Sequence, residues 1–131
     1  MRMADWDDVR RLALALPETT EDSSGDLLDW RVKEKGFVWE RPLRRRDLDA
    51  LGANAPDGPI LGARTADVGV KEALIADDPT VFFTTPHFNG YPAVLVQLDR
   101  ITVPALEELI VEAWLARAPK RLTKLYLESH Q

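Results

Sequence analysis

Hydrophobic residues recur at every third or fourth position in two long stretches of this chain, a spacing typical of amphipathic helices. The first stretch covers residues 6–16, where Asp5 is placed to cap the helix and Pro17 to end it. The second begins at Pro104 and runs to Pro119. The side chains expected to face the core are Trp6, Val9, Leu12, Ala13 and Leu16 in the first helix and Leu106, Leu109, Ile110, Ala113 and Trp114 in the second.

Shorter runs rich in β-branched and aromatic residues predict strands. We expect a first hairpin that pairs Trp30–Lys33 with Phe37–Arg41, because residues 34–36 between them end in glycine and supply a turn. Ile60–Arg64 predicts one more short strand. The acidic residues 18–26 contain two serines and a glycine, and they predict a loop.

A second hairpin is predicted further along the chain, between Val81–Thr85 and Ala93–Leu98. The dipeptide Asn89-Gly90 lies between these runs, and it favours a two-residue turn with positive φ at both positions. Such a turn places Phe88 opposite Tyr91, and in the same register Thr85 lies opposite Val94.

Three weaker helical signals complete the prediction. Residues 44–51 predict one or two helical turns, and residues 69–76 predict a brief helix. A last helix is expected after residue 119, with three side chains turned inward: Leu122, Leu125 and Tyr126. Because hairpins dominate, we predict one α+β domain over residues 1–131, an antiparallel sheet built from hairpins with helices packed on one face.

Composition narrows the class of protein. The chain has 131 residues and no cysteine, which excludes disulfides, thiolate metal sites and cysteine nucleophiles. The net charge of −5 indicates a protein that is not basic overall. No apolar run approaches the ~20 residues of a membrane span, and the acidic N-terminus lacks a hydrophobic signal core. We therefore expect a cytoplasmic monomer without a membrane partner.

Motifs for catalysis are missing from the sequence. It contains no phosphate-binding glycine loop, no nucleophile elbow and no zinc-binding helix motif, so we assign no catalytic residue, no metal and no cofactor. Of the two histidines, His130 is the second-last residue, which leaves His87 beside the Asn89-Gly90 turn. His87 has two interpretations, a ligand contact or general base on one side and a hairpin residue bonded to a nearby carbonyl on the other.

Positive charge gathers in two islands of an otherwise acidic chain. Residues 31–49 and 113–131 each have a net charge of +3. One interpretation is that they contact a nucleic-acid backbone, which makes DNA a weakly held, salt-sensitive partner. The other is that they are solvated charges, some of them offsetting a helix dipole. The candidate contacts are Arg31, Lys33, Arg41, Arg44, Arg45, Arg46, Lys120, Arg121 and Lys124.

Aromatic residues suggest an alternative kind of site. Trp30 and Trp39 lie among cations in the first hairpin, which is typical of single-strand binders but is equally explained by packing on a sheet face. A pocket for a small ligand or a protein segment is the alternative function, and its candidate lining is Trp30, Trp39, His87, Phe88 and Tyr91.

Four segments together resemble the MmcQ/YjbR family over nearly the whole chain. They are residues 14–22 (LALPETTED), 30–39 (WRVKEKGFVW), 82–96 (FFTTPHFNGYPAVLV) and 112–122 (EAWLARAPKRL). The resemblance implies a small α+β fold similar to a double-wing module, and it implies DNA binding by analogy of fold.

The resemblance leaves open which surface would contact DNA. The second hairpin has no lysine or arginine between Val81 and Leu98, so phosphate contacts would come from the first hairpin and the C-terminal helix. DNA binding is favoured if these two basic islands lie on one face of the molecule, and disfavoured if they lie on opposite faces.

Overall fold

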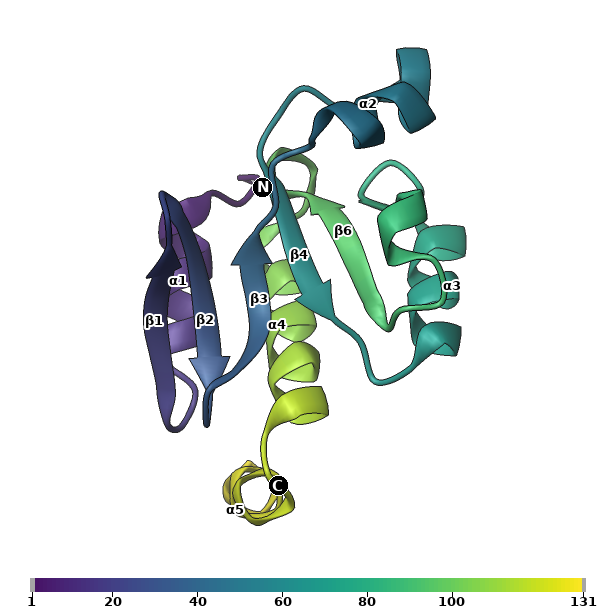
Figure 1. Cartoon of the computed structure of the whole chain (residues 1–131). Helices are drawn as coiled ribbons and strands as arrows, with labels where there is room; N and C mark the ends of the chain where they lie inside the picture. Colours follow the sequence, from purple (N-terminus) through teal and green to yellow (C-terminus); the bar gives the residue numbers. More distant parts are fainter. Residues whose placement is uncertain (1, 131) are drawn as a thin grey trace.

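A six-stranded antiparallel sheet forms the centre of the computed structural model, which describes residues 2–130 (Figure 1). The strand order is β1-β2-β3-β4-β6-β5. The first four strands therefore lie in the sheet in their sequence order, and only β5 and β6 exchange places. The α+β class predicted above is confirmed. The strands are β1 (Thr19–Ser24), β2 (Leu27–Val32), β3 (Lys35–Glu40), β4 (Ile60–Arg64), β5 (Phe82–Phe83) and β6 (Ala93–Gln97).

The two predicted long helices cover one face of this sheet. α1 (Trp6–Leu14) packs on β1, β2 and α4, and α4 (Val103–Arg117) packs across β3 and β4. Asp5 caps α1 as predicted, since its carboxylate accepts from the Asp8 N–H at 3.1 Å. The apolar stripe of α4 is buried along its length, with Trp114 fully enclosed.

Shorter elements cover the remaining surfaces. α3 (Val68–Asp77) lies beyond β6, α5 (Lys120–Ser129) projects beyond the C-terminal end of α4, and α2 (Arg45–Leu51) lies at the opposite end of the molecule (Figure 1). Turns of 3-10 helix occur at Gly52–Asn54, Pro86–Phe88 and Leu98–Arg100.

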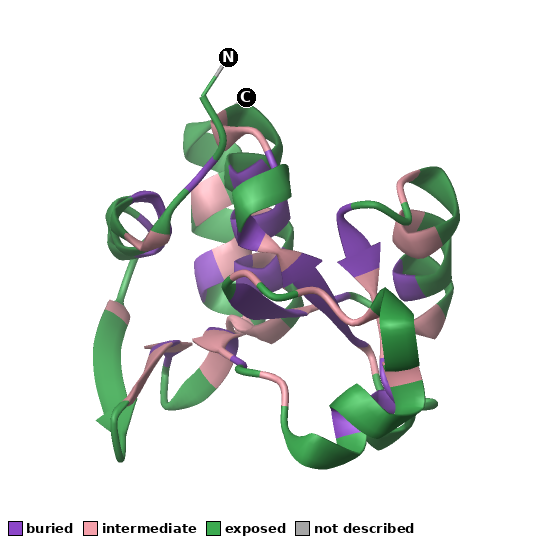
Figure 2. Cartoon of the chain, turned by 90° about the horizontal axis from the view of Figure 1, so that it is seen from above, coloured by how far each residue is buried: buried purple, intermediate pink, exposed green. Residues whose placement is uncertain are grey.

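Both faces of the central strands are buried (Figure 2). The main core lies under α1 and α4. A smaller cluster on the other face of the sheet contains Ile60, Phe88, Ala93 and Leu95, with Trp39 packed against it. This second cluster underlies the candidate site described below.

The acidic segment predicted as a loop is instead the edge strand β1. Its side chains are nearly all exposed, so no alternation of apolar residues marks it in the sequence. Backbone pairing with β2 holds it, and Gly25 at φ +64° makes the connecting turn. Glu21 fastens the strand inward because its carboxylate accepts from Arg10 at 2.7 Å and from the Trp30 indole N–H at 3.0 Å.

The predicted register of the second hairpin is wrong by one residue. Phe82 lies opposite Val96, and the strand pairing ends at Phe83. Asn89 has φ −58° and Gly90 has φ +73°, which is a type II turn rather than the mirror-image turn predicted. Pro86 and Pro92 lack the N–H groups that would extend the ladder toward a two-residue turn.

Two smaller corrections concern exposed positions. In the first hairpin the positive φ values are at Lys33 (50°) and Glu34 (68°), so the turn comes earlier than residues 34–36. In α5, Leu122 is buried as predicted, but Leu125 is 54% exposed. α5 contacts the body along a narrow strip, which leaves most of its circumference in solvent.

Candidate functional site

A cavity of about 630 Å³ opens on the sheet face opposite α1 and α4. Its walls come from the start of β2, the end of β3 and the turn at residues 87–91. Four aromatic rings predicted as ligand contacts meet here: Trp39, His87, Phe88 and Tyr91. Trp30 is not among the lining residues, because it is fully buried under α1 and bonded to Glu21.

A buried lysine holds the aromatic turn in place. Lys71 on α3 is 4% exposed, and its ammonium donates to the carbonyl oxygens of Phe88 and Tyr91, the latter at 3.0 Å. These carbonyls belong to the two ends of the type II turn. Burial lowers the pKa of Lys71. Nothing in the local sequence of α3 indicates this role, since the contact spans seventeen and twenty residues.

Tyr91 is oriented by a second cation from the neighbouring strand. Arg64 at the end of β4 donates to the Tyr91 hydroxyl at 2.8 Å, and its guanidinium lies 4.8 Å from the ring centroid. The phenol is 44% exposed but fixed in position. It therefore forms a preformed side of the cavity.

Trp39 lies flat against β4 because the facing residue is Gly62. A Cβ atom at Gly62 would come within 2.3 Å of the Trp39 indole. The missing side chain thus makes the space in which the ring lies. Sequence reasoning did not identify Gly62, whose role appears only when β3 and β4 are paired.

Arg41, which lines the cavity, forms a buried ion pair with Asp47, with 3.0 Å between Nη1 and Oδ2. The same Nη1 donates to the Pro42 carbonyl at 2.7 Å, and the guanidinium lies 5.3 Å from the Phe88 ring centroid. Burial by itself would raise the pKa of Asp47, but the Arg44 N–H and the Arg41 guanidinium outweigh burial and lower it. Arg41 is 6% exposed, so it is turned away from any surface on which a duplex would lie.

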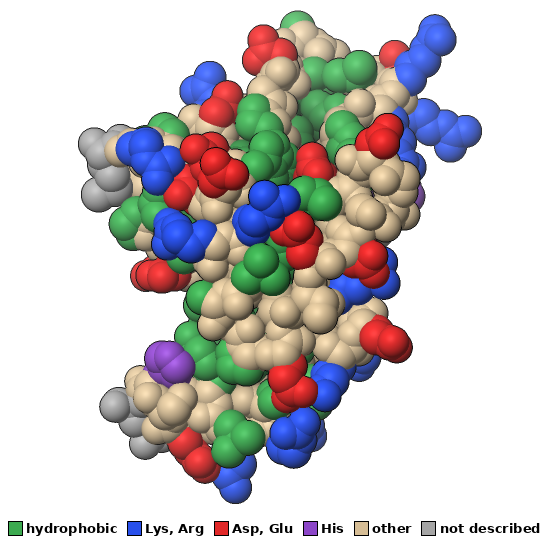
Figure 3. Space-filling view, turned by 90° about the vertical axis from the view of Figure 1, so that its left-hand side faces the viewer, with side chains coloured by type: hydrophobic (Ala, Val, Ile, Leu, Met, Phe, Trp, Pro, Cys, Tyr) green, Lys and Arg blue, Asp and Glu red, His purple; other side chains and the backbone are tan. Residues whose placement is uncertain are grey.

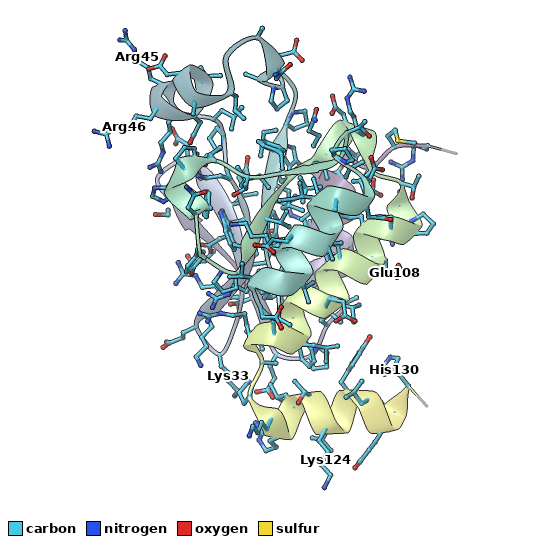
Figure 4. All side chains as sticks on the ribbon, turned by 90° about the vertical axis from the view of Figure 1, so that its right-hand side faces the viewer. Lys33, Arg45, Arg46, Glu108, Lys124 and His130 are labelled. Carbon is cyan, nitrogen blue, oxygen red and sulfur yellow. The ribbon has the colours of Figure 1, made fainter. Side chains whose placement is uncertain are left out.

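The other candidate nucleic-acid contacts are spread over separate parts of the molecule. Arg45 and Arg46 project from α2 at one end of the molecule, while Lys33 and Lys124 lie at the other (Figure 4). Arg31 lies along β2, where it pairs with Asp29 at 3.0 Å and with Asp22 at 3.5 Å. On the β1 side of the molecule cations and carboxylates are interspersed (Figure 3). The cations of the first basic island, residues 31–49, therefore do not form one continuous surface.

One carboxylate ties the first hairpin to the C-terminal helix. Glu18 forms ion pairs with Lys33 in the β2–β3 turn and with Arg121 in α5, the latter at 3.6 Å. The hydrogen bond from Lys33 is the main reason that the pKa of Glu18 is lowered. We name this end of the molecule the basic end, defined by Lys33, Lys35, Arg117, Lys120, Arg121 and Lys124.

Metal-ligand clusters and membrane-spanning helices are two features that residues 2–130 do not contain. Within them, no group of three or more metal-ligating side chains is placed to hold an ion, and the acidic residues at the start of α1 serve as its cap. No helix in this range combines the length and the apolar character that crossing a bilayer requires.

This chain is similar to known proteins in both its sequence and its fold. The model of the YjbR family matches residues 14–116. Rv2570 of Mycobacterium tuberculosis and Mb2600 of Mycobacterium bovis, both uncharacterized proteins, are each 56% identical over 128 residues, which is 95% of this chain and 97% of theirs. The crystal structure of the Deinococcus radiodurans DUF419 protein DR2400 superposes with a TM-score of 0.68 at 22% identity, covering 97% of this chain and 88% of that one.

Proposed function

This chain belongs to the YjbR family, and from its charge distribution we propose that it binds nucleic-acid backbones weakly through the basic end. The observation that carries the proposal is the double ion pair of Glu18, because it brings two basic segments distant in sequence to one end of the molecule. The first hairpin and the C-terminal helix are the two segments from which phosphate contacts were expected.

Charge at the basic end is strongly unbalanced. Six cations gather there from the β2–β3 turn, the end of α4 and the start of α5, against the carboxylates of Glu18 and Glu34. Within residues 2–130, Lys35, Lys120 and Lys124 form no ion pair, so they are available to a phosphate. Flexible lysines suit a phosphate chain because they act as point charges without demanding one geometry.

The rest of the molecule limits the affinity. The net charge of −5 opposes the approach of a polyanion, and the attraction at the basic end is short-ranged at physiological salt. Few side chains at this end are suited to reading base edges, because lysines dominate and the tryptophans of the hairpin are turned elsewhere. We therefore propose binding without sequence preference.

The first prediction concerns the salt dependence of this binding. If three lysines each neutralise one phosphate, log K against log salt has a slope of about −2.7 on duplex DNA. The measurement is fluorescence anisotropy with a labelled duplex, repeated on unrelated sequences over a series of salt concentrations. Lys120→Glu combined with Lys124→Glu should weaken binding on every sequence and reduce the slope to about −0.9.

Arg45→Glu combined with Arg46→Glu is the matched control. It changes the net charge by the same amount but at the opposite end of the molecule (Figure 4). Affinity and slope should stay close to those of the unmodified protein. Equal losses in the two double variants would show that only net charge matters, and absence of binding at low salt would reject the proposal outright.

A further inference from the structure

The cavity on the second face of the sheet is lined by arginines with unbonded N–H groups and by carboxylates that accept hydrogen bonds from the protein. Of the Arg41 guanidinium, only Nη1 has hydrogen-bond partners within residues 2–130. Nε and Nη2 have none in this range, and Arg41 lines the cavity, so this edge of the guanidinium is free to bond a molecule bound there. The side chain is nine-tenths buried, which fixes the direction of that edge.

A second cation is added by Arg44 at the mouth of the cavity. Its side chain is exposed and forms no ion pair within the described range, whereas its backbone N–H is held by Asp47 at 2.8 Å. The position of Arg44 is therefore set by the same carboxylate that anchors Arg41. Two arginines thus line one volume, and of the two only Arg41 is paired with a carboxylate within residues 2–130.

The carboxylates that line the cavity already have partners. Asp29 accepts from Arg31 with both oxygens, at 3.1 and 3.0 Å. Glu40 accepts from the Leu28 N–H at 2.8 Å, where the β2–β3 ladder has ended. Three of these four carboxylate oxygens accept hydrogen bonds, and only the second oxygen of Glu40 has no partner within residues 2–130. Because most of these acceptors are engaged while the donors of two arginines are open, the cavity favours an anion over a cation.

The remaining walls suit a flat ring. Trp39, His87, Phe88 and Tyr91 present aromatic surface around a volume of about 630 Å³, which is within the range of small-molecule sites. The turn that carries three of these rings is fixed by Lys71 and Arg64, so the walls are preformed.

We propose that this cavity binds a small aromatic molecule that carries an oxyanion, with the ring against Trp39 and Tyr91 and the oxyanion at Arg41 and Arg44. The open Nε–Nη2 edge of Arg41 matches the two oxygens of a carboxylate or of a phosphate monoester. The site is separate from the basic end, so it does not depend on the nucleic-acid proposal.

The test uses two-dimensional ¹H–¹⁵N NMR of the full chain, titrated with indole-3-acetate and with phenyl phosphate as the two oxyanion probes. The Trp39 indole N–H should shift in a saturable manner. The indole N–H groups of Trp30 and Trp114 are internal controls, since they donate to Glu21 and to the Pro17 carbonyl and should not move. Binding of either probe supports the proposal, and the stronger one identifies the oxyanion.

Neighbouring arginines provide the matched variants. Arg44→Ser should weaken binding about tenfold, the effect of losing one charge-assisted hydrogen bond. Arg45→Ser removes the same charge from a side chain that projects away from the body, and affinity should stay within about twofold (Figure 4). Gly62→Ala leaves charge unchanged but displaces the Trp39 ring, and it should also weaken binding. Thermal melts establish that each variant is folded.

Several results would overturn this proposal. Benzylamine binding as tightly as the oxyanion probes would show that the cavity does not select anions. Equal affinities in Arg44→Ser and Arg45→Ser would show that Arg44 does not contact the ligand. No shift of Trp39 at any probe concentration would show that the cavity takes no ligand of this class.

Discussion

At the scale of single residues, the buried Arg41–Asp47 pair connects stability to the candidate site. Both side chains are over nine-tenths buried, and Asp47 also accepts from the Arg44 N–H. Removing one member of such a pair leaves an uncompensated charge, which costs more than the pair itself contributes. The site therefore depends on a carboxylate that does not itself line it.

Asp47→Asn should lower the free energy of unfolding by about 3–5 kcal/mol, because Arg41 remains charged and loses its counterion. The measurement is denaturant unfolding at neutral pH. Asp49→Asn on the same helix is the matched control, since Asp49 is exposed and forms no ion pair within residues 2–130. Similar losses in the two variants would contradict the assignment.

The same variant has a defined pH dependence. The pKa of Asp47 is lower in the folded state than in the unfolded chain, so its contribution is fully present above the unfolded value of about 3.9. This contribution is lost as pH falls through the folded pKa. The stability difference between Asp47→Asn and the unmodified protein should therefore be constant near neutrality and shrink in acid.

At the scale of elements, the Asn89-Gly90 dipeptide predicts a turn at the right place, residues 88–91, but of the wrong type. Gly90 does have positive φ, but Asn89 does not, and the strands stop short of the turn. The backbone N–H of Tyr91 donates to the Phe88 carbonyl at 3.0 Å. Lys71 then binds the carbonyls that this turn presents.

Gly90→Val should lower stability by more than ~1 kcal/mol, because a β-branched residue is strained at φ +73°. Gly36→Val is the matched control: Gly36 lies in β3 without positive φ, and nothing lies within 4 Å of a Cβ placed there. Melting curves measure both. Unchanged melting of Gly90→Val would reject the type II turn.

At the scale of the whole molecule, Trp114 links parts of the chain that are far apart in sequence. Its indole N–H donates to the Pro17 carbonyl at 3.2 Å, and its ring lies 5.2 Å from the Tyr126 ring centroid. It thus joins the α1–β1 connection, α4 and α5. This contact, together with the buried Leu122 and the Glu18–Arg121 ion pair, places α5 and with it half of the basic end.

Trp114→Ala should cost about 3–5 kcal/mol, since it leaves a cavity in the interior. Denaturant titration measures the loss. Leu125→Ala, on the exposed side of α5, is the control and should cost less than ~0.5 kcal/mol. A loss below about 1 kcal/mol for Trp114→Ala would mean that the ring does not fill the core.

The sequence by itself determined the elements whose signals are local. The stripes of α1 and α4, the burial of Trp114 and the strand at Ile60–Arg64 are all readable from spacing and residue type. Periodicity reports burial directly, because the face of a helix or strand that meets the core must be apolar throughout.

Tertiary structure decided the features that depend on residues distant along the chain. β1 is a strand through pairing with β2 and without burial of its own, and Lys71 reaches a turn seventeen residues away. The first basic island divides because Arg41 turns inward to Asp47 while Lys33 is carried to the opposite end from α2. Hydrogen bonds and ion pairs act between neighbours in space, and a sequence records only neighbours along the chain.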